Sequence, residues 1–396
     1  MEAQCPLLPD DVIEGIFTRL PASLVLGCRG LSRGWAAALS SDDFVDRHRR
    51  AANRHGGPRF FLFQSSWKTN TTTTTAHAWS PARPVDGVVP LPRITMPLRY
   101  PTIITQHCRG LVLVDDGHVE GSRCVYNPST GHIARLPPCH WRAGRTLPAQ
   151  GRYESFGLGY DARSGKHKVV RVYYRGDKIP VLVQVYVLDQ EGFWRAGSDR
   201  LPRGDEAARL GERKKSPKMD SHWRVTRRGL IVSFSVADET FGVVPLPPRV
   251  DYLGEYRLTE LEGRLCLFNP IADSIHRDRR SYDLWLLRDD EAGACELRCR
   301  IDPNTASPEV ARSILSRKAS PVASMDDGRR ILFIKKSIKR WAAGPFAYTP
   351  STGNVERLPY SHMCSATLYE ENVVSPGRPY EDILFLPAAT QALCVH

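Results

Sequence analysis

A segment that occurs twice is the feature that most constrains the fold of this chain. Residues 126–137 read YNPSTGHIARLP, and residues 348–359 read YTPSTGNVERLP. Each copy reads as a strand end followed by a turn that Pro or Gly can hold. Radial repetition of one small sheet is how β-propellers limit exposed sheet edges. The repeat therefore favours a β-propeller, with a β-sandwich as the alternative.

Beyond residue 58 the sequence has the character of β-strands. Short runs rich in β-branched and aromatic residues are bounded by Gly, Pro, Asp or Asn. They are residues 60–63, 110–114, 168–174, 183–188, 230–234, 264–268, 282–287 and 331–334. The low-complexity threonine tract at 69–75 predicts an exposed loop, and residues 308–318 predict a helical interruption.

The first part of the chain, from Leu8 to about His48, has helical periodicity instead. Its first helix presents one apolar face, made by Val12, Ile13, Ile16, Phe17 and Leu20. Pro9, Asp10 and Asp11 suit the first turn of this helix, and Pro21 ends it. A module of about 40 residues buries too little apolar surface to be comfortably stable alone, so the pattern indicates a partner for its remaining apolar face.

These two patterns predict an α+β protein: a small all-α module followed by a large all-β domain. We place the helical module at residues 4–48 and the β-rich domain at residues 59–396. Residues 49–58 are expected to be a linker, because Gly56, Gly57 and Pro58 break any helix that continues into them.

Composition and charge narrow the class of protein. The chain is 41% hydrophobic and 25% charged, without an evident leader or an apolar run of membrane-spanning length, which predicts a soluble protein of the cytoplasm or nucleus. Ten cysteines in such a compartment are expected to be free thiols. The net charge of +12 includes basic clusters at 213–218 and 335–340, which we interpret as solvated loops. We expect neither a membrane nor a nucleic-acid partner.

No motif predicts a catalytic, cofactor or metal site. Cys295 and Cys299 lack a second pair of zinc ligands nearby, and the segment at 156–159, FGLG, lacks the third glycine and the helix of a phosphate loop. The pairs at 107–108 and 139–140 join a His to a Cys, but sequence neighbours seldom form a working catalytic dyad. We expect a protein that is not an enzyme and has no cofactor.

The opening segment resembles the F-box. Residues 8–21 read LPDDVIEGIFTRLP, and Cys28-Arg29 and Arg33-x-Trp35 follow in the order typical of that family. The resemblance implies binding to a Skp-type adaptor, which bridges to a cullin and a RING subunit. It places that contact on Leu8, Pro9, Ile13, Ile16, Phe17, Leu20, Pro21, Cys28 and Trp35.

The alternative for these nine residues is that they only form a local core. The sequence departs from the family pattern at residues 23–27, SLVLG. Gly30 and Gly34 also predict a shorter or looser second helix, since Gly costs about 1 kcal/mol relative to Ala in a helix.

The β-rich part resembles the F-box-associated domain of plant F-box proteins, through residues 125–131, 156–161 and 166–170. Together the two resemblances imply the substrate-recognition subunit of a Skp–cullin–F-box ubiquitin ligase, with an unidentified target protein bound by the β domain for ubiquitination and degradation. The alternative is a stand-alone β-propeller module that binds protein or glycan. In that case Leu8, Pro9 and Ile16 would be buried against the β domain.

Overall fold

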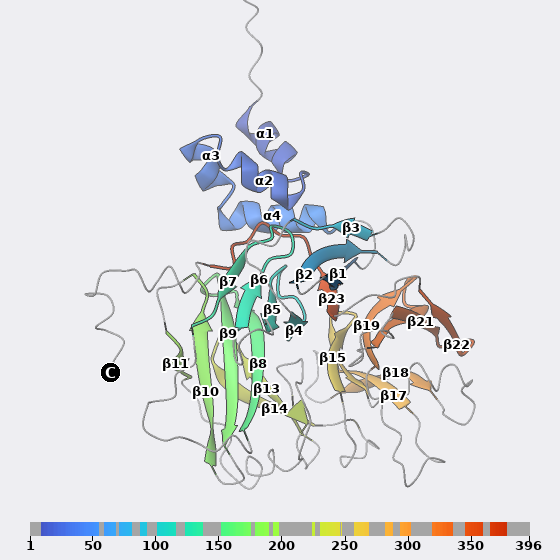
Figure 1. Ribbon diagram of the computed structural model, residues 1–396. Coiled ribbons are helices and arrows are strands. Elements are labelled where there is room, and N and C mark those ends of the chain that lie inside the picture. The colour runs from blue at the N-terminus through green and yellow to red at the C-terminus, as the bar shows by residue number, and fades with distance from the viewer. Residues whose placement is uncertain are drawn as a thin grey trace, which may run out of the picture.

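The computed structural model has a small helical head above a β-propeller (Figure 1). It describes residues 9–54, 59–68, 71–80, 88–92, 101–115, 123–137, 152–175, 179–189, 193–197, 224–225, 230–245, 247, 257–268, 282–287, 294–301, 319–335, 345–358 and 365–377. The predicted order of an all-α module and then an all-β domain is confirmed. The β domain is a propeller and not a sandwich.

The head consists of α1 (Asp10–Phe17), α2 (Ala22–Cys28), α3 (Arg33–Ala38) and α4 (Asp42–Ala52). Pro9 and Pro21 precede α1 and α2, because a Pro at the start of a helix loses no hydrogen bond. The hydroxyls of Ser32 and Ser41 cap α3 and α4 by accepting the N–H groups of Trp35 and Phe44, at 3.1 and 3.2 Å. As predicted, the second helix is short, and it ends before Gly30.

Helix α4 continues beyond the expected end of the module. Residues 49–52 form its last turns, so the first part of the expected linker is helical. Asn53 follows as the C-terminal cap, and residues 55–58 lie outside the described part. The division of the chain at residues 48 and 58 stays a prediction.

The described strands form six antiparallel sheets, numbered here as blades 1 to 6. Blade 1 contains β23 (Ser365–Tyr369), β1 (Arg59–Lys68), β2 (Thr71–Trp79) and β3 (Val88–Pro90). Blade 2 contains β4 (Thr102–Ile103), β5 (Val112–Asp115), β6 (Arg123–Tyr126) and β7 (Ile133–Arg135). Blade 3 contains β8 (Arg152–Asp161), β9 (Lys166–Arg175), β10 (Ile179–Val187) and β11 (Arg195–Ala196).

The remaining blades follow in chain order. Blade 4 contains β12 (Arg224–Val225), β13 (Leu230–Ser235) and β14 (Thr240–Pro245). Blade 5 contains β15 (Arg257–Leu261), β16 (Arg264–Phe268), β17 (Tyr282–Leu287) and β18 (Cys295–Ile301). Blade 6 contains β19 (Ala319–Met325), β20 (Arg330–Lys335), β21 (Pro345–Thr349) and β22 (Asn354–Arg357).

The two ends of the β domain meet in blade 1. The last described strand, β23, pairs antiparallel with β1, from Arg59 opposite Tyr369 to Phe63 opposite Ser365. It also contacts β4 and β19, the first strands of the two neighbouring blades. The C-terminal strand therefore takes the first-strand position of blade 1 and joins blade 6 to blade 2.

The repeated segment marks one structural position in two blades. Residues 126–137 run from the end of β6 through the turn and β7, and residues 348–358 run from the end of β21 through the turn and β22. The glycine of each copy has a positive φ, 76° at Gly131 and 70° at Gly353, which other residues seldom adopt. The N–H of each glycine binds the carbonyl four residues earlier, at 2.9 and 2.8 Å. The repeat is thus the hairpin between the third and fourth strands.

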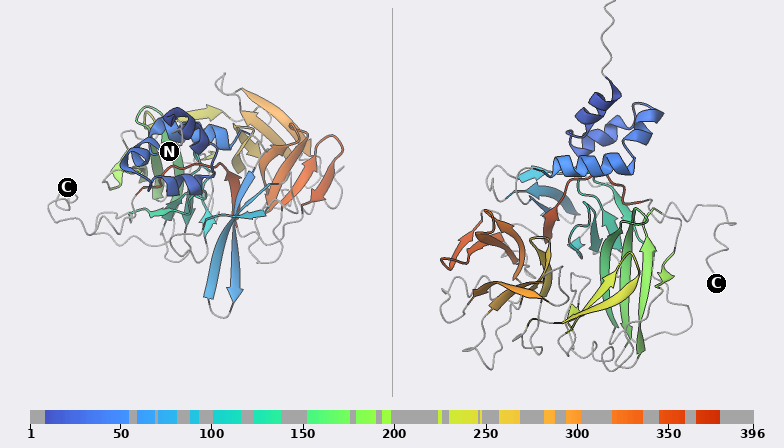
Figure 2. Two further views of the ribbon diagram at one scale, coloured as in Figure 1. Left: turned by 90° about the horizontal axis from the view of Figure 1, so that it is seen from above. Right: turned by 180° about the vertical axis from the view of Figure 1, so that it is seen from behind.

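Two other local expectations have different outcomes. The loop predicted at residues 69–75 is wrong for residues 71–75, which belong to β2 and pair with residues 64–68 of β1. Threonine is β-branched and favours strands, and this pairing extends the hairpin that projects in Figure 2. The helix predicted at residues 308–318 lies outside the described residues.

The core lies between neighbouring blades. In β1, Phe60 and Leu62 pack against blade 6, whereas Phe61 and Phe63 pack against blade 2. Alternate side chains of a strand point to opposite faces, so a strand buried on both faces needs an unbroken apolar run. This explains the sequence FFLF at residues 60–63.

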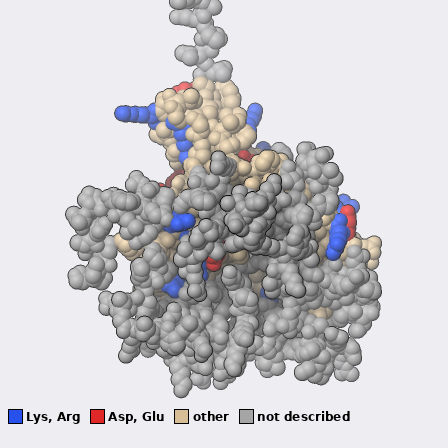
Figure 3. All heavy atoms as spheres, in the orientation of Figure 1, with Lys and Arg blue, Asp and Glu red and all other residues tan. Residues whose placement is uncertain are grey.

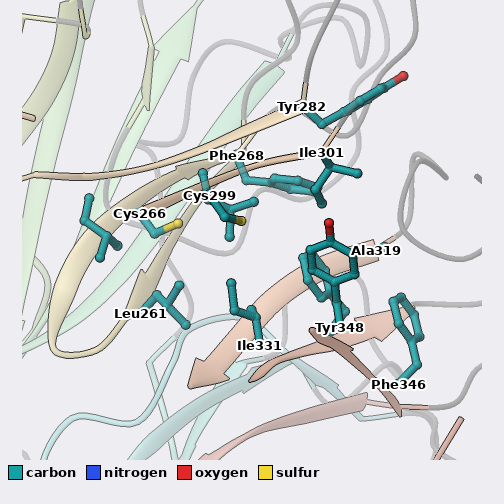
Figure 4. Close-up of a cluster of buried hydrophobic side chains, with 13 residues drawn as sticks. Leu261, Cys266, Phe268, Tyr282, Cys299, Ile301, Ala319, Ile331, Phe346 and Tyr348 are labelled. Atoms are coloured by element: carbon teal, nitrogen blue, oxygen red, sulfur yellow. The ribbon is translucent and has the colours of Figure 1, made fainter. Parts of the chain in front are cut away.

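Blades 5 and 6 share a large apolar cluster (Figure 4). Within it, Phe333 and Phe346 stack, with ring centroids 5.6 Å apart. Cys266 and Cys299 are buried free thiols in the same cluster. Burial raises the pKa of the Cys299 thiol to about 12, so it stays protonated at neutral pH. These thiols fill space in the core.

A buried charge network joins blade 3 to blade 4. The ammonium of Lys168 on β9 lies 2.9 Å from the carboxylate of Asp161 and 3.0 Å from that of Glu239, which lies between β13 and β14. It also donates to the carbonyl of Val236 at 3.0 Å. Arg195 on β11 pairs with the same Glu239 carboxylate. The network is stabilising only while each charge keeps its partners.

We expect Lys168→Met to lower the midpoint of thermal unfolding by on the order of 5 °C, because Asp161 and Glu239 would lose a partner while buried. Differential scanning calorimetry measures this shift. Lys166→Met is the control, since the Lys166 ammonium lies 3.9 Å from a well-exposed Asp189 carboxylate. Equal shifts in the two variants would contradict the assignment.

The same network predicts an acid dependence of stability. Hydrogen bonds, from Lys168 first for Asp161 and from Arg195 first for Glu239, hold both carboxyl pKa values below their usual range. The resulting stability is complete above the unfolded pKa values of about 4 and is lost as pH falls through the folded values. Lys168→Met should therefore lose less stability than the parent between about pH 7 and about pH 3. An unchanged acid slope in urea unfolding would refute this.

Candidate functional site

The head has its own small apolar core. Phe17, Ala22, Val25, Leu39 and Phe44 are buried together at the centre of its four helices. A sixth buried member, at residue 373, comes from the C-terminal end of the described chain. The sequence predicts that so small a module needs apolar surface from outside itself. Residue 373 of the same chain supplies part of that surface.

The nine residues predicted to bind an adaptor fall into three groups. Five lie in or against the head core: Ile13, Phe17, Leu20, Cys28 and Trp35. The ring of Trp35 meets that of Phe17 edge-on, with centroids 5.0 Å apart.

The other members of the set lie at the surface of the head or beyond the described part. Pro9 and Pro21 are exposed at the starts of α1 and α2. Ile16 on α1 is 45% exposed. Leu8 lies outside the described residues. The alternative of a stand-alone β-propeller module requires Pro9 and Ile16 to be buried against the β domain. Neither of them is buried there.

Four large apolar side chains of the head are exposed. We define the head patch as Val12, Ile16, Leu24 and Leu31, whose exposed fractions run from 43% to 65%. Val12 and Ile16 are one turn apart on α1, so they share a face. The view in Figure 3 shows few charged side chains on the head. Exposed apolar residues gathered in so small a module mark a candidate interaction surface.

The sequence prediction missed three members of the head patch. Val12 was placed on the apolar face of the first helix but not among the binding residues. Its spacing of four from Ile16 is a signal that could have identified it. Leu24 and Leu31 carry no such signal, because their exposure depends on how the helices of the head pack together.

A short C-terminal segment connects the head to the propeller. We call residues 370–374, which directly follow β23, the strap. On the head side, the carboxylate of Glu371 accepts the N–H of Ala22 at 2.8 Å. Its backbone exchanges two hydrogen bonds with the side chain of Asn53, at 2.8 and 2.9 Å. Val373 enters the head core, and its carbonyl accepts from Arg29 at 3.2 Å.

On the propeller side, two asparagines hold the strap. The side-chain amide of Asn127 donates to the carbonyls of Asn372 and Val374, at 3.0 and 2.7 Å. The backbone N–H of Asn372 donates to the hydroxyl of Ser129 at 3.0 Å, and its side chain donates to the carbonyl of Arg109 at 2.6 Å. Asn127 and Asn372 are both buried, and these bonds satisfy them.

Helix α4 also reaches the propeller through charged groups. Asp46 pairs with Arg109 of the β4–β5 turn at 3.2 Å. Arg49 pairs with Glu370 of the strap at 2.7 Å, and His107 approaches the same carboxylate at 3.4 Å. Burial alone would raise the pKa of Glu370, but His107 and Arg49 hold it below its usual value. Asp46, Arg49 and Asn53 lie three to four residues apart, so one face of α4 makes these contacts.

The described residues offer little for catalysis. No group of three or more His, Cys, Asp or Glu side chains within them could hold a metal ion. Burial raises the pKa of Cys108 to about 12, which makes the thiol a poor nucleophile despite its neighbour His107. The pair at 139–140 and the basic clusters at 213–218 and 336–340 lie outside the described part.

Two further findings concern surfaces. A polar hollow lies where blades 5 and 6 meet, and its charges pair internally, with Arg298 on Glu262 at 2.9 Å and Arg264 on Glu296 at 3.0 Å. None of the helices in the described ranges has the length and apolar character needed to cross a membrane.

Comparison with known proteins connects this chain to one family. The family model for the F-box associated beta propeller domain matches residues 52–294. The F-box protein CPR1 of Arabidopsis thaliana is 26% identical over 314 residues, which cover 71% of this chain and 70% of that protein. An F-box/LRR-repeat protein of the same plant is 24% identical over 282 residues, which cover 66% of this chain and 60% of the relative.

Similarity to solved structures is weaker. TolB from Acinetobacter baumannii superposes with a TM-score of 0.42 and 11% sequence identity, over 81% of this chain and 69% of TolB. Similarity of that degree says nothing about activity.

We expect Gly110→Ala to displace the strap. A Cβ at Gly110 would lie 2.6 Å from the Cβ of Asn372 and 3.0 Å from the carbonyl oxygen of Glu370. Gly263 is a matched control: it has a positive φ in the β15–β16 turn, as Gly110 has between β4 and β5, but open space around its Cβ. Each substitution strains the backbone by on the order of 1 kcal/mol, and Gly110→Ala adds the clash.

Limited proteolysis with mass spectrometry measures this effect. Cleavage after Glu370 or Glu371 by a glutamate-specific protease should accelerate in Gly110→Ala and stay at the parent rate in Gly263→Ala. Equal protection of the strap in both variants would show that it tolerates the clash.

Proposed function

Given that the chain belongs to the F-box-associated β-propeller family, as its match to that family's model over residues 52–294 shows, we propose that it is the substrate-recognition subunit of a Skp–cullin–F-box ubiquitin ligase. Its head binds a Skp-type adaptor and, through it, a cullin and a RING subunit. Its propeller binds a target protein, which is ubiquitinated and degraded. The protein acts in the cytoplasm or nucleus.

The head patch is the observation that carries this proposal. The core of the head is completed by Val373, so the patch is not needed to close the fold. Val12, Ile16, Leu24 and Leu31 nevertheless expose apolar surface to water. Burying such surface contributes about 25 cal/mol per Å², which favours an apolar partner. A Skp-type adaptor is the partner that the F-box resemblance of the head implies.

The predicted binding residues then act in two ways. Pro9 and Ile16 are exposed and would touch the adaptor, together with the rest of the head patch. Phe17, Leu20 and Trp35 pack in or against the core and would shape the surface by fixing how α1, α2 and α3 cross. For Leu8, direct contact stays a prediction from the sequence.

The chain itself performs no bond chemistry in this proposal. A ligase subunit of this kind accelerates ubiquitin transfer by holding the target near the charged conjugating enzyme, which raises the effective concentration of the reacting groups. The proposal therefore needs two binding surfaces and a defined distance between them. It needs neither a catalytic residue nor a cofactor.

We expect Val12→Asp with Ile16→Asp to weaken adaptor binding at least tenfold, which corresponds to about 1.4 kcal/mol. Both side chains are exposed, so the double variant should keep the fold of the head. Co-expression with a Skp-type adaptor, followed by calorimetric titration of the purified proteins, measures the loss.

Leu297→Asp is the control for this experiment. Leu297 is also an exposed apolar residue, 39% accessible, but it lies on β18 of the propeller. We expect it to bind the adaptor as the parent does. A folded parent protein that binds no Skp-type adaptor would overturn the proposed function. Equal weakening by both variants would show that the head patch is not the contact.

A further inference from the structure

We infer that the strap fixes the orientation of the head on the propeller, and that Asn127 and Asn372 are the residues that position it. The consequence for ubiquitin transfer rests on the proposed function. There, the strap would set the distance between the captured target and the adaptor end of the complex. The geometry itself is independent of the partner.

The strap is anchored on both sides by buried groups. It follows β23 directly, so its first residue is tied to the strand that closes the propeller. Three residues later, Val373 is only 1% exposed, in the core of the head. Between them, Asn372 is 2% exposed and bonded to the turns of blade 2. A span this short with a buried anchor at each end leaves the head little freedom to rotate.

Contacts that bypass the strap are weaker candidates for this role. The pair between Asp46 and Arg109 is about 30% exposed on both sides, and ion pairs of that kind contribute roughly 0–1 kcal/mol. Arg59 donates to the carbonyl of Ala52 and to the side chain of Asn53, but these residues flank the short junction between head and propeller. Such local bonds hold the junction and do not fix the far end of the head.

The internal repeat shows that this turn can close without an Asn, although in the first copy the side-chain oxygen of Asn127 also accepts the N–H of Ser129 at 2.8 Å. The equivalent residue in the second copy is Thr349, and the same backbone bond closes the turn in both, at 2.9 Å in the first and 2.8 Å in the second. Ser129 and Thr130 of the first copy are buried, whereas the equivalent Ser351 and Thr352 of the second are exposed. The side-chain NH2 of Asn127 serves the strap, through its two bonds to the carbonyls of Asn372 and Val374.

The test is a distance measurement between head and propeller in the full chain. Nitroxide labels are placed at Ser40 in the head and at Arg329 in the β19–β20 turn, both exposed. They enter as unnatural amino acids, because ten native cysteines preclude thiol labelling. The variant combines Asn127→Thr with Asn372→Ala, which removes the side-chain bonds of both asparagines.

The repeat supplies the control, Thr349→Asn with Asn354→Ala, which makes the reverse Thr/Asn exchange and one Asn→Ala change at the copy without a strap. We expect one narrow distance distribution in the parent and the control. The strap variant should broaden it by about twofold, as a locally released element does. Amide hydrogen exchange of α1 to α4 in the same samples shows whether the head stays folded. Broadening with retained protection supports the inference.

Two outcomes would overturn it: a distribution in the strap variant as narrow as in the parent, or broadening accompanied by loss of protection throughout the head. The second would make the strap a folding element and not a positioning one. Adaptor titration of the same proteins separates this inference from the proposed function. Failure of the parent to bind the adaptor leaves the distance result intact, and unchanged distances leave adaptor binding intact.

Discussion

The pairing of β23 with β1 is the contact on which the other parts of this structure depend. It brings the last described strand of the chain beside the first and places it between blades 6 and 2. Both faces of blade 1 are buried against its neighbours, as Phe60 and Phe61 of β1 show. Without β23, the aromatic side chains of β1 would lose the neighbour that completes their sheet.

The same strand delivers the strap to the head. Val373 enters the core formed by Phe17, Val25 and Phe44, so the helical module and the propeller share one cooperative contact. A module of about 45 residues is too small to be comfortably stable alone. The chain compensates with an apolar side chain from its opposite end, and this leaves Val12, Ile16 and Leu24 free for a partner.

Buried polar groups fix the geometry of two junctions, the one between head and propeller and the one between blades 3 and 4. Apolar contacts alone would let these parts slide past each other. Asn127 donates to two carbonyls of the strap, and Asn372 of the strap donates to the carbonyl of Arg109 in the propeller. Lys168 joins Asp161 to Glu239 between blades 3 and 4. A buried donor or acceptor left without its partner costs about 1–3 kcal/mol, more if it is charged. These groups therefore favour one arrangement of head and blades, and a ligase subunit with two separated binding surfaces would need such an arrangement.

The sequence by itself determined the helical head, the change to β-strands and the propeller, because periodicity, Pro and Gly positions and the repeated turn are local signals. It also identified Ile16 and Phe17 on one helix, but not that the first is exposed and the second buried. Only the tertiary structure decided three features: the strand formed by residues 71–75, the strap, and the different roles of Asn127 and Thr349. The physical reason is that each depends on a partner distant in the chain, such as Val374 for Asn127, and no local pattern specifies which distant segment will arrive there.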